Sequence, residues 1–170
     1  LLRIVTSCNI ACGGHAGDAT SMRNTAVSAL ALEVAIGAHP SYPDRDGFGR
    51  RSKFMAGDEL LSSLEEQINT LLEITAGIGA LLRHVKPHGA LYNDAARDAE
   101  LAALVVTAVI RSAPGASLVG LPNSELQKAA AEGELKFISE GFIDRAYRAD
   151  GQLLPRSEPG AVHAQLDVIV

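Results

Sequence analysis

The chain has 170 residues, of which 47% are apolar and 4% aromatic, and its net charge is −5. This length and apolar fraction suit one domain with an aliphatic core and argue against disorder. The acidic balance provides no basic stripe for nucleic acid, and no apolar run is long enough to span a membrane.

The two cysteines, Cys8 and Cys12, are too few for a disulfide framework, so we expect a reducing, cytoplasmic location. The chain starts with Leu1 rather than an initiator methionine and ends in an apolar run. We therefore expect residues 1–170 to be a fragment of a single domain that is incomplete at both ends.

Strands and helices are predicted to alternate along the chain. Asp18 is placed to cap the first helix, and Asp58 to cap the second. Repeated β-α units imply a parallel sheet with helices packed outside it, and the polar loops then follow the carboxyl ends of the strands. No dinucleotide-binding or P-loop motif follows any strand. The predicted strands are 4–10, 34–38, 81–85, 117–121 and 135–139, and the predicted helices are 19–33, 58–77, 98–112 and 124–131.

Three histidines, His15, His39 and His88, each follow a predicted strand. Parallel strands would bring them to one rim, where they could bind a divalent metal with a carboxylate such as Asp18. They could instead hold a substrate and move protons, or only hydrogen-bond the loop backbone. His84 lies deeper in its strand and is expected to be a core histidine.

Charged groups accompany these histidines. Lys86, held before a proline, could stabilise an oxyanion or bind a carboxylate, or could form a structural ion pair. The loop that contains Asp44, Arg50 and Arg51 could clamp an anion, or could be held by its own ion pairs. Cys-x-x-His at Cys12 is a weak zinc signal, and a buried thiol is the simpler interpretation.

Five ordered motifs together resemble the LamB/YcsF family, which comprises bacterial 5-oxoprolinase A subunits. The resemblance runs over nearly the whole chain. Two smaller departures are Cys8, where the family usually has Ala, and Gly14, where it usually has Phe, which removes an aromatic wall beside His15. The motifs are Ser7–Asp18, Ile36–Pro40, Gly47–Arg51, Val85–Asn93 and Asp144–Tyr147.

The resemblance implies an irregular α/β fold, a (β/α) barrel of the glycoside hydrolase/deacetylase type with seven strands. It implies hydrolysis of 5-oxo-L-proline to L-glutamate with ATP as co-substrate, together with partner subunits B and C; whether the protein forms a homo-oligomer stays open. Family segments before residue 1 and after residue 170 are absent. The site residues expected from the motifs are His39, His88 and Lys86 for catalysis, and Asn9, His15, Asp18, Arg50, Tyr92 and Arg145 for substrate binding, with His15, His39 and His88 as the candidate ligands of a divalent metal.

Two other functions remain open from the sequence. A metal-dependent deacetylase acting on acetylated carbohydrate would use the same barrel and the same histidine-rich rim. A non-catalytic subunit that presents a small ligand to its partners would also need such a rim.

Overall fold

The fold is built on one parallel sheet whose strands lie side by side in the order in which they occur in the chain. The structure is a computed structural model and describes residues 1–163. All five predicted strands are present in it, although β1 begins three residues later than predicted. The strands are β1 (Ser7–Ala11), β2 (Ala35–His39), β3 (Leu82–Val85), β4 (Ser117–Gly120) and β5 (Phe137–Ser139).

The helices begin where side chains or backbone geometry allow it. Asp18 caps α1 through the Ser21 amide, and Asp98 caps α4 through two amides. Asp58 was expected to cap α2, but α2 starts one residue earlier, after Ala56, and Asp58 lies in its first turn. There its negative charge still stabilises the helix, because the N-terminus of a helix carries partial positive charge. The helices are α1 (Ala19–Ala31), α2 (Gly57–Ala76), α3 (Gly89–Ala95), α4 (Ala99–Ser112) and α5 (Glu125–Glu132).

Helix α3 was not predicted from the sequence. It is only two turns long and starts at His88, whose side chain makes no capping hydrogen bond, so neither periodicity nor a cap marks it. Gly89 has φ +62, and a Cβ there would lie 2.2 Å from the Gly49 carbonyl oxygen. Glycine therefore lets the start of α3 pack directly on the loop after β2.

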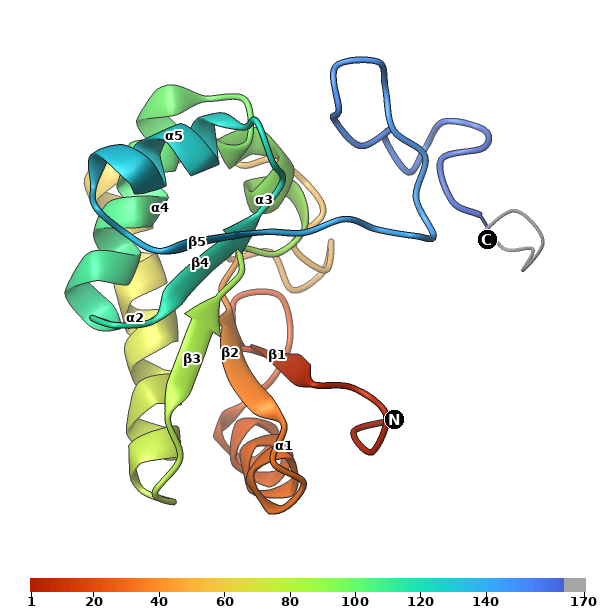
Figure 1. The fold of residues 1–170 in the computed structure, drawn as a ribbon. Coiled ribbons are helices and arrows are strands. Elements are labelled where there is room, and N and C mark those ends of the chain that lie inside the picture. Colours follow the sequence, from red (N-terminus) through yellow and green to blue (C-terminus); the bar gives the residue numbers. More distant parts are fainter. Residues whose placement is uncertain (164–170) are drawn as a thin grey trace.

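Helices α2, α4 and α5 pack together along one face of the sheet, and the segment after β5 extends away from them (Figure 1). The core between sheet and helices is aliphatic, with Leu64, Ile68, Leu71 and Leu118 fully buried. Parallel strands in consecutive order form the wall of a (β/α) barrel, so the α/β fold is confirmed. The count of seven strands stays a prediction.

Two further observations concern the cysteines and the apolar content of the helices. Both cysteines are free thiols. Within residues 1–163, no helix has the length and apolarity that crossing a bilayer requires.

Candidate functional site

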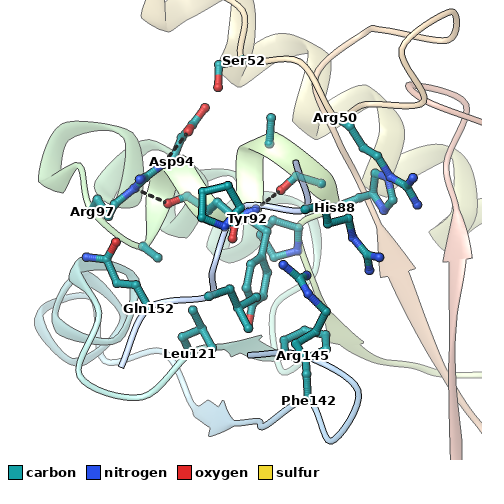
Figure 2. A pocket seen from close by; sticks show the side chains of 18 of the residues that line it. Arg50, Ser52, His88, Tyr92, Asp94, Arg97, Leu121, Phe142, Arg145 and Gln152 are labelled. Carbon is teal, nitrogen blue, oxygen red and sulfur yellow. Dashed lines mark hydrogen bonds and ion pairs between the residues drawn. The ribbon is translucent and has the colours of Figure 1, made fainter. Parts of the chain in front are cut away.

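A cavity of about 510 Å³ opens beyond the carboxyl ends of β2 and β3. Its walls are the loops after these strands, helix α3 and the segment 142–157, which returns over the rim. Figure 2 shows Arg50, His88 and Arg145 on one side of the cavity, with Asp94 and Arg97 on the other. Six of the predicted site residues line it, namely His39, Arg50, Lys86, His88, Tyr92 and Arg145.

The three predicted histidines form one cluster, although His15 lies behind the cavity wall. The rings of His15 and His88 are stacked with centroids 3.7 Å apart, and His39 meets His88 edge-on. His88 Nδ1 lies 3.0 Å from His39 Nε2, and His15 Nδ1 lies 3.0 Å from the Ser41 hydroxyl. The Phe48 ring packs edge-on against His15 at 5.2 Å.

The hydrogen bonds of the His39–His88 pair constrain its protons. His39 Nδ1 lies 2.6 Å from the Lys86 carbonyl and must donate to it, so its Nε2 is the acceptor for His88 Nδ1–H. His88 Nε2 lies 2.9 Å from the Phe48 carbonyl. A neutral His88 has one N–H, so it can donate either to His39 or to the Phe48 carbonyl, but not to both. One added proton satisfies all three contacts, so the pair is suited to accept one.

The environment keeps the cluster uncharged before that proton arrives. Burial, then the charges of His88 and Arg45, lower the pKa of His15 to about 4. Burial and the charge of His88 lower the pKa of His39 to about 3, although its bond to the Lys86 carbonyl acts in the opposite direction. Burial also lowers the pKa of His88, while the Phe48 carbonyl raises it. At neutral pH the three imidazole rings are therefore uncharged, and each keeps a nitrogen without a proton.

The cluster does not fit the predicted three-histidine metal site. Both ring nitrogens of His39 and of His88 face hydrogen-bond partners, which a metal ion would have to displace. Among residues 1–163, no group of three His, Cys, Asp or Glu side chains is arranged to hold a metal. No step proposed below depends on a metal.

Lys86 forms an ion pair, one of the roles predicted for it. Its ammonium pairs with Glu140 Oε2 at 2.6 Å and faces the Phe142 ring at 4.6 Å and the Tyr92 ring at 5.7 Å. The pair is largely buried, so solvent screens it little. The ammonium is thereby held rigidly in the cavity wall, where it can meet a developing oxyanion.

Two buried polar atoms lie beside Lys86, namely Tyr92 Oη and Glu140 Oε1. Burial, then the charge of Glu140 and a side-chain hydrogen bond with it, raise the pKa of Tyr92, so Tyr92 Oη lies beside the Glu140 carboxylate. Both atoms are enclosed by the protein, and they belong to the wall that holds the Lys86 ammonium.

The arginines divide as the two sequence hypotheses suggested. Arg51 pairs with the buried Asp44, whose carboxylate also accepts the Gly47 amide, so this part of the loop is held by its own ion pair. Arg50 instead lies over the Phe48 ring, at 5.3 Å, and lines the cavity. Arg145 is buried, and Nε and Nη2 donate to the carbonyls of Ala161 and Leu154.

Besides His15, two other predicted substrate-binding residues do not line the cavity. Asp18 is exposed and caps α1 through Ser21. Asn9 Oδ1 accepts a hydrogen bond from His84 Nε2 at 2.9 Å, and His84 is a buried histidine, as expected. In the structure, Asp18 thus stabilises the start of α1, and Asn9 links strand β1 to strand β3. Cys12 is a buried thiol whose pKa burial raises to about 12, in agreement with a structural role.

An aromatic ring does lie beside His15 in spite of Gly14, because Phe48 packs there. A Cβ at Gly14 would lie 2.5 Å from the Gln67 side-chain oxygen and 2.7 Å from the Ser41 hydroxyl. These two groups, bonded to each other through the Ser41 backbone, fill the space where a larger residue would stand.

Three charged residues that line the cavity were not selected from the sequence. Asp94, Arg97 and Arg156 depend on where α3 and the segment after β5 fold. Glu140, which directly follows β5, belongs to a mixture of acidic, basic and phenolic residues at 140–147 that the sequence does offer. Nothing near Arg156 in the sequence sets it apart from other surface arginines.

Comparisons with known proteins agree with this architecture. The chain is 45% identical over 162 residues to proteins named as the A subunit of 5-oxoprolinase from Haemophilus influenzae strains PittEE and 86-028NP. The match covers 95% of this chain and 66% of theirs, so the chain spans just under two thirds of these curated relatives. The crystal structure of a lactam utilization protein from Thermus thermophilus superposes with a TM-score of 0.92 at 39% identity, covering 99% of this chain and 68% of that one. The LamB/YcsF family model matches residues 1–170, and the chain therefore belongs to the LamB/YcsF family.

Proposed function

We propose that this chain carries the lactam-opening site of an ATP-dependent 5-oxoprolinase, in which 5-oxo-L-proline is hydrolysed to L-glutamate. The relatives named as a 5-oxoprolinase A subunit and as a lactam utilization protein support this substrate class. The observation that carries the proposal is the cavity itself, where a rigid ammonium and a proton-accepting histidine pair share one wall.

In the proposed reaction, the lactam oxygen is first phosphorylated by ATP, and Lys86 stabilises the negative charge that the phosphorylated oxygen carries. Water attacks the carbonyl carbon from a position in which it replaces the Phe48 carbonyl as the partner of His88 Nε2, and it gives its proton to that nitrogen. His39, fixed by the Lys86 carbonyl, holds the other side of the His88 ring. The lactam nitrogen takes up this proton from His88 as the lactam C–N bond breaks.

Substrate orientation is assigned to two further groups. Arg50 binds the substrate carboxylate from the open side of the cavity, since an arginine matches a carboxylate in bidentate fashion. The Tyr92 ring, which lines the cavity beside the Lys86 ammonium, packs against the body of the lactam.

ATP is proposed as co-substrate of the assembled complex, with subunits B and C as partners in the cytoplasm. Phosphorylation of the lactam oxygen would weaken the amide. Addition of water, C–N cleavage and hydrolysis of the resulting acyl phosphate by a second water would then yield glutamate and phosphate.

The experiment is glutamate release from 5-oxoproline by the full-length protein, with and without ATP and the partner subunits. Lys86→Met is expected to lower kcat about a hundredfold or more. The matched control is Lys128→Met, which removes an exposed lysine paired with Glu125 on α5. No release by the folded, assembled complex would refute the proposal, and metal-dependent, ATP-independent deacetylation of an acetylated sugar would replace it.

A further inference from the structure

The cavity carries more positive charge than one 5-oxoproline carboxylate can balance. Five cationic side chains line it, and one carboxylate, Asp94, does so as well. Asp94 is paired with Arg97, and Lys86 is paired with Glu140. Within residues 1–163, the other three cations, Arg50, Arg145 and Arg156, have no ion-pair partner.

Arg145 is held in place for a ligand. The residue is 8% exposed, and two backbone carbonyls fix Nε and Nη2 of its guanidinium. Its Nη1 makes no hydrogen bond to the part of the chain that the structure describes and is not sealed off as a buried orphan. A guanidinium stays charged at physiological pH, so this group offers its remaining donors to the cavity.

Among nearby cations, Arg156 has the largest effect on the pKa of Arg145. Burial lowers the pKa of Arg145, the charge of Arg156 is the next cause, and the charge of Asp144 acts in the opposite direction. Arg156 also contributes to lowering the pKa of His88. Arg145 and Arg156 both line the cavity and form no ion pair within residues 1–163, so an anion bound there would offset their mutual repulsion.

We propose that Arg145 and Arg156 form a phosphate-binding subsite next to His88, separate from the carboxylate site at Arg50. The ligand class is a phosphate group, which two guanidinium groups can bind through several charge-assisted hydrogen bonds. This inference rests on the proposed function and extends it, because it lets this chain receive a phosphorylated lactam or retain the phosphate product.

The test is calorimetric titration of the full-length protein with inorganic phosphate at constant ionic strength. We expect one phosphate per chain, and we expect Arg156→Gln to weaken binding at least about tenfold. Arg156 is exposed and makes none of the described hydrogen bonds, so this variant should fold normally. Arg156→Lys, which keeps the charge but not the fork, should retain part of the affinity.

The matched control is Arg148→Gln, since Arg148 lies in the same segment but pairs with Glu158 and does not line the cavity. It should bind phosphate like the unaltered protein. Absence of saturable phosphate binding by the folded protein, or equal affinities for Arg156→Gln and Arg148→Gln, would overturn the subsite.

A second titration identifies the source of the phosphate group. The phosphonate analogue of glutamate carries a carboxylate and a phosphate-like group on one molecule. Binding tighter than inorganic phosphate, with sensitivity to both Arg50→Gln and Arg156→Gln, assigns the subsite to a phosphorylated substrate; equal affinity assigns it to free phosphate. Because neither titration needs turnover, loss of phosphate binding and loss of 5-oxoproline hydrolysis are separate results.

Discussion

The buried histidines predict a steep loss of stability in mild acid. His15 is 4% exposed, and its pKa is lowered to about 4 from an ordinary value of 6.5. Between these values the unfolded chain binds one proton more than the folded chain, so the free energy of unfolding falls as the pH falls. The slope reaches about 1.4 kcal/mol per pH unit for one group. From pH 6.5 to pH 5 His15 alone should cost about 2 kcal/mol.

His39 should add a cost of similar size over the same interval, because its pKa is lowered to about 3. Against a total stability of about 5–15 kcal/mol, the two histidines together matter. The measurement is denaturant unfolding at several pH values between 5 and 8, for the unaltered protein and for His15→Gln. The variant loses one titrating group, so its stability should depend on pH less steeply, by up to about 1.4 kcal/mol per pH unit.

Ile36→Val is the control, since it weakens packing in the buried strand β2 without removing a titrating group. It should be less stable at every pH and keep the original slope. Identical slopes for His15→Gln and the unaltered protein would refute the claim that His15 is buried in its neutral form.

Three further changes test other parts of the structure. Gly49→Ala should lower the free energy of unfolding by roughly 1–3 kcal/mol, because φ is +65 and a Cβ would lie 2.9 Å from both His15 and His88. The control Gly79→Ala, at φ +72 in open space, should lower it by only about 1 kcal/mol. Equal losses for the two variants in chemical denaturation would contradict the clash at Gly49. Asp18→Ala removes the cap of α1, so it should lower Tm by a few degrees and leave the KM for 5-oxoproline unchanged. A raised KM would show that Asp18 takes part in substrate binding. Glu140→Gln should lower kcat about tenfold or more in the glutamate-release assay by freeing the Lys86 ammonium, and an unchanged kcat would show that the ion pair has no part in catalysis.

Much of the scaffold could be predicted from the sequence, because strand and helix signals are local. The alternation of short apolar runs with amphipathic segments identified all five strands, and Asp18 and Asp98 marked helix starts. Helix α3 escaped because two turns that begin at a histidine and a glycine carry no such signal.

The site was predictable where a residue directly follows a strand or lies in a family motif. His39, Lys86 and His88 were found because the end of a parallel strand has a fixed place on the rim, and Arg50, Tyr92 and Arg145 were found through the motifs. Arg156 reaches the cavity through the return of an irregular segment, and the ring of Phe48 reaches His15 through a loop with positive φ. Such long-range contacts depend on the whole fold, so neighbouring residues do not reveal them.

Lys86 contributes to the site twice, through atoms that belong to different parts of the residue. Its carbonyl oxygen accepts from His39, and its ammonium pairs with Glu140. A shift of the backbone at the end of β3 would alter both bonds together. The spacing between the proton-accepting pair and the charge-stabilising group is thus set by the length of one side chain, and a substitution that preserved the charge but shortened the stem, such as ornithine for lysine, would change that spacing while leaving the histidine bond intact.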